Sequence, residues 1–245
     1  MKAAFTASNR RSFLQATSAA LVLSALPLTA LAQAGGKMKI GIIGSGRVGS
    51  NIGSAWVKAG HEVMFSSLDL EADKKLAASL GGGAKAGTPR EAAAFGTVLM
   101  IAVPYKAMPS VGKDLGELLK GKIVIDPSNP IVARDGDMAV TAREKGAGLS
   151  SMEYLPGARI VRAFNAIGAA RMGEAHTKAD KRIGMPIAGD DQNAITTASA
   201  LIRDVGYEPV LVGTLATMGK YLIPGTPLGG EHSPEEIRRV AATLK

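Results

Sequence analysis

The chain has 245 residues, of which 46% are hydrophobic and 4% aromatic, and it contains no cysteine. This length and composition suit one domain with one substantial core, and the lack of cysteine excludes disulfides and thiolate metal sites. The formal net charge is +8. Because the basic residues form no block and few aromatic residues lie among them, we expect no nucleic-acid partner.

The first 34 residues have the features of an export signal. Arg10 and Arg11 precede Phe13 and Leu14, and a mildly apolar run follows from residue 16 to residue 32. This order is typical of a twin-arginine signal peptide. A membrane-spanning helix is the alternative, but about 17 mostly small residues fall short of the roughly 20 strongly apolar ones that a bilayer requires. We therefore expect no stable membrane span.

Two overlapping small-x-small triplets, at residues 30–32 and 32–34, mark the expected cleavage point. Cleavage near residues 32–34 leaves a single domain, residues 35–245. The removed segment carries three basic residues and no acid, so the net charge falls from +8 to +5. The sequence predicts export by the twin-arginine machinery to the periplasm or another compartment outside the cytoplasm.

Strand and helix patterns alternate from residue 38 onward. Buried strands are predicted within 38–44, 61–67, 97–104, 122–130, 158–165, 182–189 and 207–213. Helices are predicted at 48–60, 70–83, 89–96, 105–121 and 190–206, with a longer loop before residue 158. A last helix begins at Ser233, with Pro234 at its first position and Glu236 placed for a capping box.

This alternation predicts an α/β fold, because strands separated by helices are joined by right-handed parallel crossovers. We expect a doubly wound, mostly parallel Rossmann-type sheet with helices on both faces.

A glycine motif lies between the first predicted strand and the first predicted helix. Gly44, Gly46 and Gly49 have the G-x-G-x-x-G spacing, with Ser45, Arg47 and Val48 between them. Such a turn lets a pyrophosphate approach the backbone and the amino end of the helix. Glycine turns are common, but a complete β-α-β unit surrounds this one, so the sequence predicts a dinucleotide site.

The end of the second predicted strand bears on which dinucleotide binds. NAD sites usually have an acidic residue there, whereas this chain has Ser66 and Ser67. Two hydroxyls can donate to a 2′-phosphate, and Arg47, with the neighbouring pair Lys74 and Lys75, could add positive charge. The two lysines also fit a solvated helix face, and Asp69 keeps NAD(H) open as the less favoured cofactor. We expect NADP(H).

Several segments together resemble a known family. They are "KIGIIGSGRVGSNIG", "HEVMFSS", "LMIAVPYKAM", "VIDPSNP", "RIVRAFNAIGA" and "IAGDD". From about residue 37 to residue 212 the chain is similar to the reductases that pass hydride between NADPH and an 8-hydroxy-5-deazaflavin coenzyme. The same module occurs in the cytosolic domain of mammalian metalloreductases and in the N-terminal domain of pyrroline-5-carboxylate reductase.

The resemblance implies roles for three further loops. It places Ala102, Val103 and Pro104 beside the nicotinamide, and Asn129 in the same cofactor site. It assigns a substrate pocket to four residues, which are Ser128, Pro130, Phe164 and Asn165. The family commonly has an arginine after the serine that ends the second strand, where this chain has Leu68. That departure weakens the expectation of NADP(H).

No catalytic triad or metal site is expected. His61, His176 and His232 stand alone, with no partner at ligand spacing, and hydride transfer needs positioning more than a protein acid or base. We expect an oxidoreductase that uses NADP(H) and a small or flavin-like substrate.

Two alternatives stay open: a non-catalytic dinucleotide-binding module, and an imine or hydroxyacid reductase. Relatives of the second kind append an all-helical domain, whereas this chain returns to strands. The sequence leaves the substrate and the oligomeric state open, with a homodimer as one option.

Overall fold

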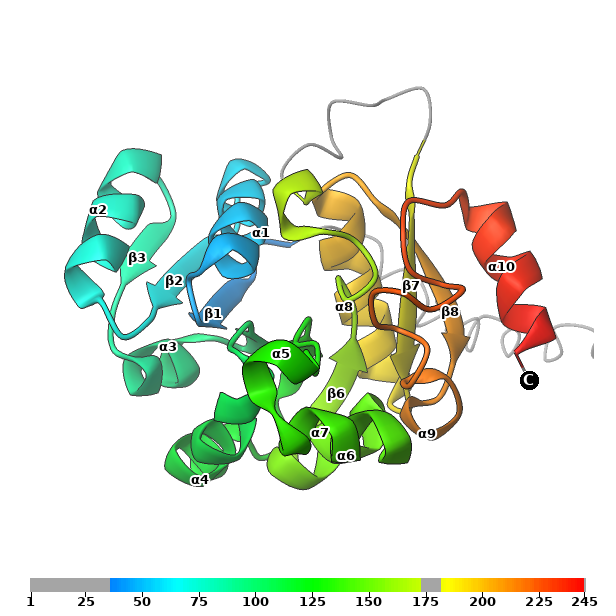
Figure 1. Ribbon diagram of the computed structural model, residues 1–245. Coiled ribbons are helices and arrows are strands. Elements are labelled where there is room, and N and C mark those ends of the chain that lie inside the picture. Colours follow the sequence, from blue (N-terminus) through cyan, green and yellow to red (C-terminus); the bar gives the residue numbers. More distant parts are fainter. Residues whose placement is uncertain (1–35, 173–181, 245) are drawn as a thin grey trace, which may run out of the picture. The chain divides into compact units, whose positions relative to one another are not determined.

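An eight-stranded sheet organises the chain, in the order β3-β2-β1-β4-β5-β6-β7-β8 (Figure 1). The computed structural model describes residues 36–172 and 182–244. The predicted signal peptide and His176 lie outside the described residues. Residues from Gly36 onward belong to one compact unit. Within the described ranges, no helix is long and apolar enough to cross a membrane.

The strands are β1 (Lys39–Ile43), β2 (Glu62–Ser66), β3 (Ala84–Ala86), β4 (Val98–Ile101), β5 (Ile123–Asp126), β6 (Arg159–Arg162), β7 (Gly184–Gly189) and β8 (Glu208–Gly213). The α-helices are α1 (Arg47–Lys58), α2 (Leu70–Leu80), α3 (Pro89–Phe95), α4 (Met108–Leu119), α5 (Val132–Asp135), α6 (Asp137–Lys145), α7 (Ala147–Tyr154), α8 (Gln192–Asp204), α9 (Leu215–Met218) and α10 (Pro234–Thr243). Two short 3₁₀ helices are η2 (Tyr105–Ala107) and η3 (Ala169–Arg171).

The doubly wound, mostly parallel sheet is confirmed. Strands β1 to β6 are parallel to one another, and β8 is parallel to β7. Strand β7 runs antiparallel to β6, and this pair makes the sheet mostly and not wholly parallel. A parallel pair needs a return path to the opposite edge of the sheet, usually a helix. Between β6 and β7 the described residues provide only η3.

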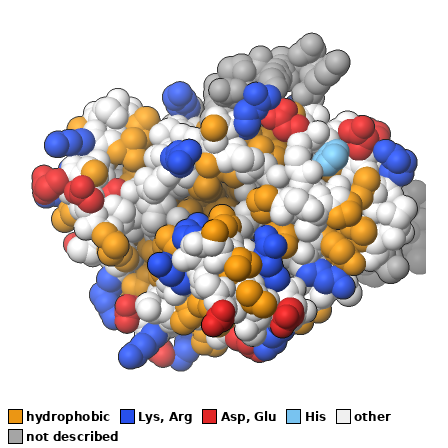
Figure 2. Space-filling view, viewed as in Figure 1, with side chains coloured by type: hydrophobic (Ala, Val, Ile, Leu, Met, Phe, Trp, Pro, Cys, Tyr) orange, Lys and Arg blue, Asp and Glu red, His pale blue; other side chains and the backbone are white. Residues whose placement is uncertain are grey.

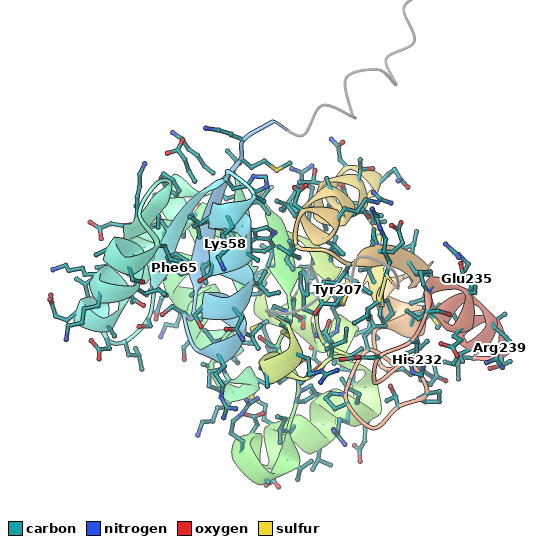
Figure 3. All side chains as sticks on the ribbon, turned by 90° about the horizontal axis from the view of Figure 1, so that it is seen from above. Lys58, Phe65, Tyr207, His232, Glu235 and Arg239 are labelled. Carbon is teal, nitrogen blue, oxygen red and sulfur yellow. The ribbon has the colours of Figure 1, made fainter. Side chains whose placement is uncertain are left out.

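Helices cover both faces of the sheet because the strands alternate their buried side chains. On one face, Ile40 and Ile42 of β1 share a core with Ile52 and Trp56 of α1 and with α8. On the other face, Ile43 belongs to a core with side chains of α3, α4, α6, α7, α9 and α10. In Figure 3, Phe65 of β2 and Tyr207, just before β8, lie in opposite halves of the molecule. Both side chains are fully buried.

The predicted elements agree with the structure in their order, but β3, η3 and α9 were not predicted, and a loop was predicted before residue 158. Strand β3 was not predicted, because three residues of mixed polarity carry no alternation signal. The predicted loop before residue 158 was wrong, because it contains α5, α6 and α7. These helices are short and are interrupted at Gly136 and Gly146, whose φ angles of 60° and 105° end one helix and redirect the chain into the next. The breaks hide the helical periodicity.

A buried ion pair joins the carboxyl ends of β5 and β6. Arg162 Nη1 lies 2.6 Å from Asp126 Oδ2, and both side chains are fully buried. Ser151 of α7 donates its hydroxyl to the same carboxylate oxygen at 2.7 Å. Arg162 Nη2 donates to the carbonyls of Ser128 and Leu222, at 3.1 and 3.2 Å. One arginine thus holds a strand, the loop after β5 and a C-terminal loop together.

Replacing Arg162 with methionine tests this role. Arg162→Met keeps an apolar stem of similar length but leaves the Asp126 carboxylate buried without its ion-pair partner. We expect a loss of about 3–5 kcal/mol in the free energy of unfolding, measured by urea denaturation. The control is Arg159→Met on the same strand, whose 3.8 Å pair with Asp191 is partly exposed, for which less than about 1 kcal/mol is expected. Equal losses would contradict the assignment.

Candidate functional site

A crevice of about 430 Å³ opens where strands β1, β4, β5 and β6 end. Figure 2 shows a hollow in the middle of this face, with hydrophobic side chains on its floor and Lys and Arg side chains around it. In the register, Ile43 of β1 is beside Ser66 of β2 and Ile101 of β4. The carboxyl ends of these strands therefore meet at one edge. The change of strand order on either side of β1 places the crevice at the topological switch point, where open α/β sheets bind ligands.

The structure brings most of the predicted cofactor residues to this crevice. Those that line it are Gly46, Arg47, Val48, Ala102, Val103, Pro104 and Asn129, together with Ser128 and Phe164 from the predicted substrate pocket. Seven of the predicted cofactor and substrate residues are not part of the crevice lining. They are Gly44, Ser45, Gly49, Ser66, Ser67, Pro130 and Asn165.

The three glycines of the motif differ in what a side chain at each position would meet. Gly44 has a φ of 98°, and a Cβ there would lie 2.5 Å from the carbonyl oxygen of Ala102. At Gly49 a Cβ would lie 2.1 Å from the carbonyl oxygen of Gly44, so α1 can pack this closely on the turn only without a side chain. At Gly46 a Cβ would meet nothing within 4 Å. The second glycine therefore faces open space, as expected if a ligand occupies it.

The buried ion pair of Asp126 and Arg162 holds the loop after β5 in place through hydrogen bonds to Ser128. Ser128 donates its backbone N–H to Asp126 Oδ1 at 2.8 Å and its hydroxyl to the carbonyl of Ile101 at 2.9 Å. Asn129 donates its side-chain amide to the carbonyl of Asn165 at 2.9 Å. The Oδ1 atom of Asn129 is buried and has no hydrogen-bond partner among the described residues. An amide N–H of a ligand in the crevice would satisfy it.

Phe164 closes the far wall in an unusual backbone conformation. Its φ of 63° makes it the only non-glycine with positive φ among the described residues. A bulky residue in this region costs on the order of 1–3 kcal/mol. The ring is fully buried and meets Trp56 and Tyr207 edge-on, with centroid distances of 6.3 and 6.1 Å. These contacts offset the strain and fix the start of the loop that borders the crevice.

The hydroxyls of the two serines at the end of β2 both donate to groups within the protein. Ser66 is buried and donates its hydroxyl to the carbonyl of Ile42 at 2.6 Å. Ser67 donates to Asp73 Oδ2 at 2.8 Å. Asp73 was not predicted as a site residue. A signal existed, because Asp73 lies on the same face of α2 as Leu76, Ala77 and Leu80, where a charged residue is unusual.

Sequence reasoning also missed part of the crevice lining. The additional residues are Pro127, Ile131, Arg134, Ile167, Gly168, Ala169, Met172 and Pro224. Arg134 lies beside Asp135, with Nη2 to Oδ2 at 2.8 Å, and also donates to the carbonyl of Asn129. Its place four residues after the "SNP" segment, which was predicted to line the crevice, was a usable signal, but a loop without a role was expected after that segment.

The histidines do not form a metal or catalytic site in the described part of the chain. His61 is buried, accepts at Nδ1 from the Met38 backbone N–H and pairs through Nε2 with Asp204 at 3.0 Å. No cluster of three potential metal ligands occurs among residues 36–172 and 182–244.

A larger open groove, of about 650 Å³, lies near the start of α10. It is lined by several acidic residues, and His232, Glu235 and Arg239 mark this region in Figure 3. A capping box between Ser233 and Glu236 already satisfies backbone donors at the start of α10. No dinucleotide motif lies there, so the smaller crevice is the candidate site.

Asp135 anchors the Arg134 side of the crevice and generates a pH prediction. Burial by itself would raise the pKa of Asp135, but hydrogen bonds from Arg134 and from the backbone N–H groups of Ile131 and Lys106 outweigh it and hold the pKa below its usual value. A lowered pKa stabilises the fold above the ordinary pKa, and this contribution is lost as the pH falls through the folded-state value.

We expect Asp135→Asn to lower the free energy of unfolding by about 1–3 kcal/mol at neutral pH. The difference from the parent should shrink below about pH 4. Urea denaturation at both pH values measures it. Asp137→Asn, an exposed acid at the start of α6, is the control and should cost less than about 1 kcal/mol. A pH-independent difference would refute the assignment.

Comparisons with known proteins agree with the resemblance seen in the sequence. The family model described as NADP oxidoreductase, coenzyme F420-dependent, matches residues 39–130. The metalloreductase STEAP3 of Rattus norvegicus is 29% identical over 184 residues, covering 73% of this chain but only 34% of that protein. The F420-dependent NADP reductase of Methanothermobacter thermautotrophicus is 28% identical over 181 residues, covering 69% of this chain and 77% of the reductase.

A solved structure extends the agreement to the fold. The hypothetical protein from Sinorhizobium meliloti has a TM-score of 0.70 at 25% identity, covering 83% of this chain and 98% of that one. The matched residues 39–130 include the glycine turn, the end of β4 and the Asn129 loop. Residues 39–130 of this chain therefore match the model of the NADP oxidoreductase family described as coenzyme F420-dependent, and a longer stretch is similar to an F420-dependent NADP reductase.

Proposed function

We propose that this protein is an oxidoreductase that transfers hydride between a bound nicotinamide dinucleotide, NADP(H), and a small or flavin-like acceptor. The single observation that carries the proposal is the glycine turn. Gly44 and Gly49 are required for close packing, whereas Gly46 faces open space beside the crevice.

The residues present fit a dinucleotide along the whole crevice. The backbone around Gly46 and the start of α1 would hold the pyrophosphate, because helix amino ends present free N–H groups and a positive dipole. Ala102, Val103 and Pro104 would border the nicotinamide. The unpartnered Asn129 Oδ1 would accept from its carboxamide. When bound, the cofactor supplies the hydride chemistry.

The far wall suits a flat, largely apolar acceptor. Four apolar residues after β6 and in the C-terminal loop line it, which are Phe164, Ile167, Met172 and Pro224. Arg134, on the rim, offers a positive charge to an acidic substituent. The names of two relatives, a metalloreductase and an F420-dependent NADP reductase, supply the class of electron acceptor for this proposal.

The chain's own contribution to the reaction is positioning and exclusion of water. None of the described residues that line the crevice is His, Cys, Asp or Glu. A hydride passed between two stacked rings needs no proton from the protein, so such a lining is compatible with turnover.

Gly46→Val tests the cofactor site. A branched side chain there fills the space that the pyrophosphate needs, so we expect the Kd for NADPH to rise at least about 100-fold. The free energy of unfolding should change by less than about 1 kcal/mol, because a Cβ at Gly46 meets no atom within 4 Å. Calorimetric titration and urea denaturation measure the two quantities.

Gly116→Val is the matched control for this experiment. Gly116 lies in α4, and a Cβ there also meets nothing within 4 Å. Unchanged NADPH binding is expected in this variant. If Gly46→Val binds NADPH like the parent, the turn does not hold the dinucleotide. Tight binding by the parent without oxidation of NADPH by any flavin or deazaflavin would assign the protein to non-catalytic binding modules.

We also propose that residues 1–34 direct export by the twin-arginine route. The motivation is the order of Arg10, Arg11, Phe13 and Leu14 before the apolar run. Replacing Arg10 and Arg11 together with lysine should leave uncleaved precursor in the cytoplasm, because the pair is read as arginines and not as charge alone. Fractionation and immunoblotting measure it. Normal export of the double variant would refute this route.

A further inference from the structure

A buried carboxylate lies at the ribose end of the candidate cofactor site. Asp73, in the first part of α2, is only 1% exposed. Its Oδ2 accepts the hydroxyl of Ser67 at 2.8 Å, and its Oδ1 accepts the hydroxyl of Ser45. Ser45 belongs to the glycine turn and Ser67 follows β2, so Asp73 joins the two segments between which a dinucleotide fold places the ribose.

The position of this acid is unusual for the fold. The ribose-binding acid normally ends the second strand, where this chain has Ser66 and Ser67. Ser66 is committed to the carbonyl of Ile42 inside the core. The carboxylate at this place therefore comes from the neighbouring helix, six residues after Ser67.

The hydroxyl of Ser67 has no proton to spare for a phosphate. It carries one proton, which lies between Asp73 Oδ2 at 2.8 Å and the carbonyl of Asp69 at 3.2 Å. Its oxygen accepts the backbone N–H of Asp69 at 3.1 Å. A phosphate ester at neutral pH is mainly an acceptor, whereas a ribose hydroxyl can donate to the Ser67 oxygen.

Part of the positive charge that would attract a 2′-phosphate is absent or already paired near this point, although Arg47 and Lys75 remain as cations. Leu68 is fully exposed at the position where the family commonly has arginine. Lys74 is paired with Glu71 at 2.8 Å. A phosphate beside Ser67 would therefore face the Asp73 carboxylate across one serine.

We infer that Asp73 is a positioning residue that determines cofactor choice. By drawing the Ser45 and Ser67 protons inward, it suits the ribose end to sugar hydroxyls and limits the advantage of NADP(H) over NAD(H). The protein then uses both cofactors, with Kd values for NADPH and NADH within about tenfold, or 1.4 kcal/mol. This inference rests on the proposed function.

Asp73→Asn tests the inference. The amide keeps one acceptor oxygen, removes the negative charge and can donate to the Ser67 oxygen, which frees the serine proton. We expect the Kd for NADPH to fall about tenfold and the Kd for NADH to change less than about twofold. Fluorescence titration of the purified protein with each nucleotide measures the ratio. A merely structural role for Asp73 would weaken both nucleotides together.

Asp69→Asn is the matched control. Asp69 is the exposed N-cap of α2, and asparagine caps a helix equally well. This variant removes the same charge from the same helix without touching the serine hydroxyls. Its Kd ratio should shift by less than about twofold. An equal shift would overturn the inference, because it would show that net charge, or Asp69 itself as the ribose-binding acid, sets the ratio.

Ser67→Ala gives a second test that leaves Asp73 in place. Because the Ser67 proton goes to Asp73, removing this hydroxyl should change the Kd for NADPH by less than about twofold in the parent. Combined with Asp73→Asn, it should cancel most of the gain in NADPH affinity. A selective tenfold loss of NADPH affinity in Ser67→Ala alone would show that Ser67 serves the phosphate, and would overturn the inference.

The two proposals fail in different ways. If the parent binds neither NADH nor NADPH, the proposed function is wrong and the inference falls with it. If the parent binds at least one of them but Asp73→Asn leaves the ratio of Kd values unchanged, only the inference on Asp73 is wrong.

Discussion

The buried ion pair between Asp126 and Arg162 connects the core of this protein to its candidate site. Two charges removed from water are tolerated only when each has well-placed partners. Here the partners come from the Ser128 backbone, the Ser151 hydroxyl and the Leu222 carbonyl. Satisfying the pair therefore fixes the loop after β5, and this loop presents Asn129 to the crevice.

A second constraint acts at the glycine turn and at Phe164. At the glycine turn, backbone segments approach one another without side chains between them. The carbonyl oxygens of Ala102 and Gly44 leave no room for a Cβ at Gly44 and Gly49. Phe164 is held in a left-handed conformation by the aromatic rings around it. The crevice thus lies between two rigid segments, which is the arrangement that hydride transfer by positioning requires.

At the proposed ribose end of the site, a side chain of helix α2 accepts the hydrogen bonds of two serine hydroxyls. Strand β2 ends in serines, which by themselves would suit a phosphate. The first part of α2 brings the Asp73 carboxylate to the hydroxyls of Ser67 and of Ser45 in the glycine turn, and both hydroxyls donate to it. This helix contributes no residue to the crevice lining, and our inference on cofactor choice rests on its contact with the two hydroxyls.

The sequence by itself determined the alternation of elements and the glycine turn, because each depends on local periodicity or on spacing within one β-α-β unit. It also predicted much of the crevice lining, including Val103 and Asn129. Only the tertiary structure decided the antiparallel β7, the helices hidden in residues 132–154, the Arg162 pair and the meeting of Asp73 with Ser45 and Ser67. The Arg162 and Asp73 contacts join residues 6 to 60 positions apart, and local patterns carry no information on which distant side chains come into contact. The helices in residues 132–154 were hidden because Gly136 and Gly146 interrupt their periodicity.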